Sequence, residues 1–229
     1  MFLFDWNYFL FIAIPTMIIS LGVQMYLRRT YAKWSKVRNT PGLTGTQVGD
    51  LLFDRTALNE IPLQVVPGQM TDHFDPRANV VRLSQGTAGQ PSVAAMAIAA
   101  HELGHVQQYQ TGSALIKARS MLVPALQFSP TLSYISILLG IMFNLAGLLW
   151  LGVLFFALMV VFSILTLPVE FDASRRGIRL LTEAGLLNSE QDANGAKAVL
   201  RAAALTYVAA AITSILQLLY YISLANRRR

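Results

Sequence analysis

The chain has 229 residues, of which 54% are hydrophobic and 13% are charged, whereas a soluble domain carries about 25% charged residues. The formal net charge is +6, and basic residues cluster after the first apolar run and at the C-terminus, which is typical of contact with anionic lipid. We find no nucleic-acid-binding motif. The composition therefore predicts the lipid bilayer as a partner and excludes nucleic acid. Because cysteine is absent, disulfides and thiolate metal ligands are excluded as well.

Three apolar runs predict membrane-spanning helices. They cover residues 8–27, 121–168 and 202–224. A helix needs about 20 residues to cross the hydrocarbon core, so the first and last runs match one span each and the central run matches two. A turn near Asn144 would separate those two. We therefore expect about four transmembrane helices, the first of which is a retained anchor because it lacks a signal-peptide cleavage pattern.

The segment between the first two spans has the composition of a small soluble domain. Apolar positions at helical spacing follow Thr44 and Thr46, either of which is a suitable N-cap. Residues 63–66 and 79–83 are rich in β-branched side chains and are bounded by turn formers, which predicts two short strands. A long helix is expected from Ser92 to about Gln110. These elements predict a mixed α+β segment.

The long helix carries the pattern His101-Glu102-Leu103-Gly104-His105. Four residues advance a helix by about 400°, so both imidazoles project from one face and can reach one ion. Glu102 would lie beside the metal, where it can take a proton from bound water. With three histidines in the chain, this spacing arises by chance in about one chain per thousand of this composition. The motif therefore predicts Zn²⁺ bound by His101 and His105.

A catalytic zinc takes three protein ligands and leaves a fourth position for water. The remaining histidine is His73, and among the carboxylates Glu170 is best placed, just after the predicted third span. Two intervening spans return the chain to the side of the membrane that holds His101, as a shared metal requires. The alternative for Glu170 is a solvated residue in the first helical turn after Pro168, which the helix dipole favours.

The sequence resembles the YugP-type neutral zinc metallopeptidases, a family of multi-pass membrane proteins. The resemblance rests on residues 71–77, 80–84, 99–105, 167–176 and 203–208. It implies a zinc metallopeptidase with Glu170 as the third metal ligand. The broader HtpX-type membrane proteases usually carry Asp four residues after that Glu, where this chain has Ser174. Asp172 could orient a ligand histidine or pair with Arg175 or Arg176, and both alternatives stay open.

The predicted fold class is a mainly α membrane protein of about four transmembrane helices, with a small α+β zincin-like catalytic domain at the membrane surface. The expected segments are 1–27 (first span), 28–120 (catalytic segment), 121–168 (membrane hairpin), 169–201 (third-ligand helix) and 202–229 (last span and basic tail). Five basic residues follow the first span, which places the catalytic segment in the cytoplasm. Four spans would leave the basic residues 227–229 outside the cell, whereas the same rule places basic residues inside. We give more weight to the larger basic cluster after the first span.

The expected reaction is hydrolysis of a peptide or protein substrate, with Glu102 as general base. His73 is the first candidate for stabilising the oxyanion; alternatively it is a turn histidine bonded to neighbouring backbone. Tyr109 and Tyr207 are weaker candidates. We also expect the strand at 80–83 to offer an exposed edge to an extended substrate. Two other classes of protein remain: an intramembrane-cleaving metalloprotease, and a non-catalytic membrane protein with structural zinc.

Overall fold

The computed structural model describes residues 6–227 and is mainly helical, with one small sheet, as the sequence predicts. Contacts divide the chain into two compact units. One holds the segments up to Gln24, Lys117–Pro168 and from Leu205 on; the other holds Met25–Ile116 and Val169–Ala204. The elements in chain order are α1 (Trp6–Tyr8), a π-helix (Phe9–Ala13), α2 (Ile14–Trp34), α3 (Gly45–Arg55), β1 (Leu63–Val66), β2 (His73–Asp75), β3 (Val80–Ser84), α4 (Gln85–Gly89), α5 (Val93–Gln110), α6 (Ala114–Leu126), α7 (Ser129–Met142), α8 (Ala146–Glu183) and α9 (Glu190–Asn226).

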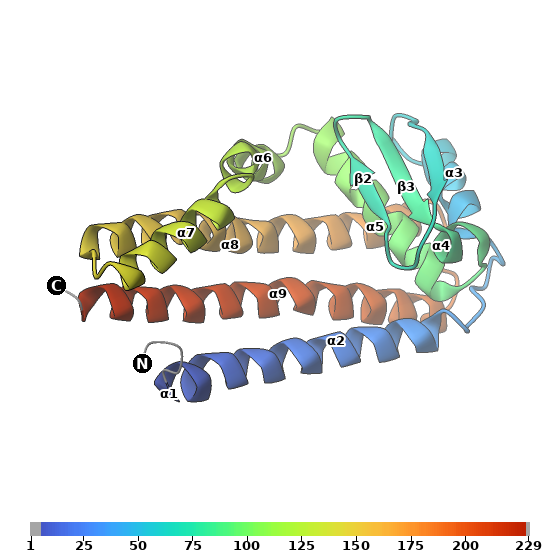
Figure 1. Ribbon diagram of the computed structural model, residues 1–229. Helices are drawn as coiled ribbons and strands as arrows, with labels where there is room; N and C mark the ends of the chain where they lie inside the picture. The colour runs from blue at the N-terminus through green and yellow to red at the C-terminus, as the bar shows by residue number, and fades with distance from the viewer. Residues whose placement is uncertain (1–5, 228–229) are drawn as a thin grey trace. The chain divides into compact units, whose positions relative to one another are not determined.

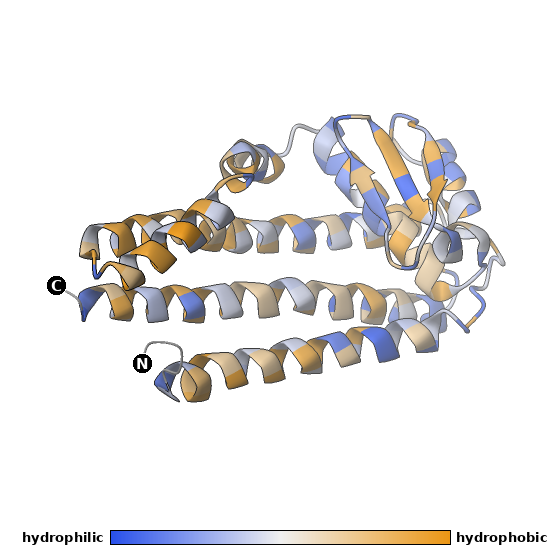
Figure 2. Ribbon diagram, in the orientation of Figure 1, coloured by the Kyte–Doolittle hydropathy of each residue, from blue (hydrophilic) through white to orange (hydrophobic). Residues whose placement is uncertain are grey.

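Three helical stretches within residues 6–227 are long and apolar enough to cross a membrane: Trp6–Trp34, Ala146–Glu183 and Glu190–Asn226. Hydrophobic residues predominate along α7 and the first part of α8 (Figure 2). The helices α6 and α7 are long and apolar enough to cross a membrane only when taken together, and they are bent by 48° relative to each other. Since α7 has 14 residues, it is only about 21 Å long. The structure thus contains three candidate spans, or four if the bent pair is one span.

The second unit contains a three-stranded sheet in the order β1-β3-β2. The strand β3 pairs in parallel with β1, where Leu63 lies opposite Val81, and antiparallel with β2, where Phe74 lies opposite Val81. Figure 1 shows β2 and β3 side by side with α5 packed against them. The strand β3 is therefore central. The expectation that it offers a free edge to a substrate is wrong, because both of its edges are already paired.

Side-chain N-caps fix where the two helices that the sequence predicts in this unit begin. The Thr44 hydroxyl accepts a hydrogen bond from the Gln47 amide, and the Gln47 side chain accepts one from the Thr44 amide, which forms a capping box. At the start of α5 the Ser92 hydroxyl accepts from the Ala95 amide at 3.1 Å. Thr111 follows the last residue of α5, as predicted. The capping residues thus set where α3 and α5 begin.

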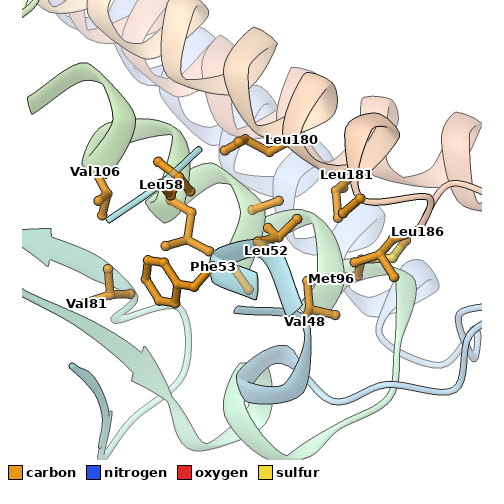
Figure 3. Close-up of a cluster of buried hydrophobic side chains, with 14 of the residues drawn as sticks. Val48, Leu52, Phe53, Leu58, Val81, Met96, Val106, Leu180, Leu181 and Leu186 are labelled. Atoms are coloured by element: carbon orange, nitrogen blue, oxygen red, sulfur yellow. The ribbon is translucent and has the colours of Figure 1, made fainter. Parts of the chain in front are cut away.

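A hydrophobic core holds α3, α5, β3 and the end of α8 together within this unit (Figure 3). Its most enclosed side chains include Leu52 from α3, Val81 from β3, Met96 and Val106 from α5, and Leu181 from α8. Full burial of such a side chain stabilises the fold by about 1.5–3 kcal/mol. The core therefore fixes α5 against the part of α8 that follows Pro168.

Glycines bring the backbones of α5 and α8 unusually close. A Cβ on Gly104 would collide with the Ala173 carbonyl oxygen, and a Cβ on Gly177 would lie 2.7 Å from the Ala100 carbonyl oxygen. Both obstructions are backbone atoms, which cannot rotate away as a side chain can. Only glycine at positions 104 and 177 permits this approach, so the glycine inside the His101–His105 motif has a packing function.

Replacing Gly104 by alanine is expected to force α5 and α8 apart. Overpacking of this kind costs about 2–3 kcal/mol, which lowers the thermal unfolding midpoint by roughly 5–10 °C in a chain of this size. Gly89→Ala is the matched control, because a Cβ there meets no atom within 4 Å. Thermal unfolding in detergent, followed by circular dichroism, measures both. An equal midpoint for the two variants would contradict the close-packing argument.

Candidate metal centre

The two histidines of the motif lie on α5 with their rings on the same face. The His101 and His105 ring centroids are 4.8 Å apart and their planes meet at 82°. Their side chains are 13% and 12% exposed, so they are mostly enclosed but still reachable from solvent. The helical spacing therefore brings the imidazoles together as predicted.

The helix α8 brings the Glu170 carboxylate to these imidazoles. Its Oε2 lies 3.4 Å from His101 Nε2 and 3.5 Å from His105 Nε2, and its side chain is 4% exposed. The helix continues through Pro168 without a break. Glu170 is therefore a buried residue within a long helix. The alternative of a solvated first-turn residue is wrong.

The separations between these atoms fit a tetrahedral zinc site. One candidate ligand atom from each of His101, His105 and Glu170 lies within 4.8 Å of the other two. For bonds of about 2.1 Å, tetrahedral geometry places neighbouring ligand atoms about 3.4 Å apart. The two nitrogen–oxygen distances of 3.4 and 3.5 Å agree with that value. Two imidazole nitrogens and one carboxylate oxygen are also a donor set that zinc prefers.

The electrostatics of the site favour a positive charge. Burial lowers the pKa of His105, but hydrogen bonding to Glu170 and the charges of Glu102 and Glu170 raise it more, so the net shift is upward. Glu102 is itself 7% exposed. Two carboxylates beside two imidazoles in an enclosed place therefore create a potential that attracts a cation.

Gln108 fixes the orientation of His105. Its side-chain nitrogen donates to the Val169 carbonyl and to Asp172 Oδ2, both at 2.8 Å, and its Oε1 lies 3.1 Å from His105 Nδ1. The Val169 carbonyl and the Asp172 carboxylate can only accept hydrogen bonds. The side-chain NH₂ group of Gln108 must therefore face them, and its side-chain oxygen must face the imidazole. His105 Nδ1–H therefore donates to Gln108, which leaves Nε2 as the ring atom that can bind a metal.

Asp172 does not contact a motif histidine directly. Besides Gln108, its Oδ2 accepts a hydrogen bond from Arg176 Nε at 2.7 Å, so the predicted pairing with Arg176 is present. Asp172 also reaches His105 indirectly through Gln108. The other motif histidine is contacted by Ser174, whose hydroxyl lies 3.2 Å from His101 Nδ1. Sequence reasoning missed Gln108 and gave Ser174 no role, although Gln108 lies one helical turn after His105.

His73 belongs to strand β2, so its predicted place in a turn is wrong. It is exposed, and its Nδ1 lies 2.8 Å from the Thr71 carbonyl oxygen, as expected for a histidine bonded to neighbouring backbone. Its role as oxyanion donor stays a prediction. Tyr109 is 47% exposed and its ring contacts Phe74 at 5.6 Å, whereas Tyr207 is half-buried on α9.

Comparisons with known proteins agree with the donor set. A family model described as "Putative neutral zinc metallopeptidase" matches residues 9–226. The protein named "Putative membrane protease YugP" from Bacillus subtilis (strain 168) is 35% identical over 214 residues, covering 93% of this chain and 95% of the relative. No solved structure matches at a significant level. The resemblance inferred from sequence motifs is thus confirmed: the chain belongs to the neutral zinc metallopeptidase family that this model describes.

Proposed function

We propose that the protein is a membrane-bound zinc endopeptidase in which His101, His105 and Glu170 hold the metal and Glu102 is the general base. The observation that carries the proposal is the convergence of two Nε2 atoms and one carboxylate oxygen at tetrahedral spacing. Such a three-ligand set leaves one position for water, as catalytic zinc sites do. Family membership supports the reaction class.

Zinc at this site would supply a bound water with a pKa near 7 and polarise the scissile carbonyl group. Glu102 would take one proton from the attacking water and return it to the leaving amine, so that one water adds across the peptide bond. Gln108 accepts a hydrogen bond from His105 Nδ1, which leaves Nε2 of His105 for the metal, and the Ser174 hydroxyl lies 3.2 Å from His101 Nδ1. The enclosure of the carboxylates strengthens their interactions with charge in the site.

The proposed location is the cytoplasmic side of a membrane, with the chain inserted through its apolar helices. Three helical stretches support insertion, and the basic residues that follow the first apolar run support the side. A site near the bilayer surface suits peptides or proteins that are themselves membrane-associated. The helix α5, which carries the motif, is not one of the candidate spans within residues 6–227, which weighs against cleavage inside the bilayer.

Removal and return of zinc test the proposal. Purified protein should contain about one zinc per chain and hydrolyse a fluorogenic peptide library. A chelator should abolish both, and added zinc should restore both, because the metal supplies the activated water. Metal content by mass spectrometry and hydrolysis by fluorescence give the two readouts. Undiminished hydrolysis by the zinc-free protein would show that the proposed chemistry is wrong.

A further inference from the structure

A hollow of about 580 Å³ that is wide open to solvent, here called the cavity, lies between α8 and α9 in the second unit. Its lining is of two kinds. Apolar contact comes from Phe171, Ile178 and Leu200, and positive charge comes from residues on both helices: Arg175, Lys197 and Arg201. No carboxylate lines it. A ligand that fits this cavity therefore combines negative charge with apolar groups.

The protein compensates the three cations of this cavity only through charge that lies outside a salt bridge, as between Arg175 and Asp172. Each is exposed, and none forms a salt bridge within the part of the chain that the structure describes. The neighbouring Arg176 differs, because its Nε contacts Asp172 Oδ2 at 2.7 Å. Three cations around one hollow repel each other unless an anion lies between them.

The position of the cavity in the sequence indicates which anion is available. Arg175 is the first basic residue after the apolar run that ends at Pro168, and Arg201 directly precedes the apolar run that starts at Ala202. When both apolar runs are in the hydrocarbon core, these residues lie at the depth of the lipid headgroups. Basic pockets between helices at this depth are typical binding sites for anionic headgroups.

We propose that this cavity binds an anionic phospholipid, with the headgroup phosphate among Arg175, Lys197 and Arg201 and the start of an acyl chain against Phe171. The charge, the apolar contact and the membrane depth all match this ligand. Inorganic phosphate offers the same charge but no apolar part. Lipid binding at this site does not require peptide hydrolysis.

The cavity and the candidate metal centre share one neighbouring residue. Ser174 lines the cavity, and its hydroxyl is 3.2 Å from His101 Nδ1. The same side chain thus contacts both sites. A lipid bound here would therefore contact a residue that also contacts His101.

Titration with lipid tests the site on the zinc-loaded full chain in neutral detergent. Phosphatidylglycerol should raise the thermal unfolding midpoint with a saturable dependence, whereas phosphatidylcholine and inorganic phosphate should not. Each removed cation should weaken the apparent affinity about fivefold, since one basic residue near an anionic surface contributes about that factor. The variants are Arg201→Gln, and Lys197→Gln combined with Arg201→Gln.

Arg179→Gln is the matched control, because Arg179 is exposed on α8 but does not line the cavity. We expect the affinity of this variant for phosphatidylglycerol to stay within about twofold of the wild-type value. If Arg179→Gln and Arg201→Gln weakened lipid affinity equally, the effect would come from the overall charge of the protein, and the proposed site would be wrong. An equal response to inorganic phosphate would overturn the lipid assignment. Because the readout is binding, failure of peptide hydrolysis would leave this result unaffected.

Discussion

Glu102→Gln is expected to lower peptide hydrolysis by about 10²- to 10⁴-fold while the protein keeps its zinc. General base catalysis contributes a factor of that size, and glutamine cannot accept the proton. The two side chains have almost the same shape, so the buried position of residue 102 remains filled. The turnover number on a fluorogenic peptide and the zinc content, measured on the same preparation, give the result.

The matched control is Glu60→Gln, which makes the same chemical change at an exposed position. Its hydrolysis and zinc content should equal those of the wild type. Hydrolysis that survives in Glu102→Gln would exclude this residue as the base. Loss of zinc in parallel with activity would show that Glu102 helps to hold the ion, because a catalytic base alone is not needed to bind zinc.

The motif was predictable from sequence because its geometry is local. His101 and His105 lie four residues apart on a helix whose cap, Ser92, can also be recognised from residue type. The contact between Glu170 and the motif histidines depends on tertiary structure. In the sequence, only membrane sidedness and the family resemblance support Glu170 as a ligand. The close packing at Gly104 makes that contact possible, and no local pattern indicates which backbone a glycine will meet.

Other errors have physical causes of the same kind. The three residues of β2 lie next to Pro76 in a polar stretch, which is typical of a turn. Pairing with β3 makes them a strand, and an ion pair of 2.6 Å between Arg82 and Asp75 supports that pairing. Likewise, Pro168 suggests a helix boundary, but α8 continues through it. In both cases tertiary contacts override local preference.

Glu170→Ala is expected to remove the bound zinc. The carboxylate supplies one of three protein ligands in our proposal. Its side chain is only 4% exposed, so water cannot easily take its place as a ligand. The affinity should fall by more than the roughly 10- to 100-fold that changes outside the ligand set cause. Competition with a chromophoric chelator of known affinity measures the loss, and circular dichroism checks that the helices persist. A variant that retains full zinc would show that Glu170 is not a ligand.

Gln108→Leu provides the graded comparison, because it removes the hydrogen bond to His105 Nδ1 without removing any ligand. Leucine fills a similar volume at this fully buried position, but His105 can then rotate or carry its proton on Nε2. We expect zinc affinity to fall by about 10- to 100-fold, less than in Glu170→Ala. Equal losses in the two variants would mean that Glu170 acts only by positioning the histidines. The order of the two affinities therefore distinguishes a metal ligand from a residue that orients one.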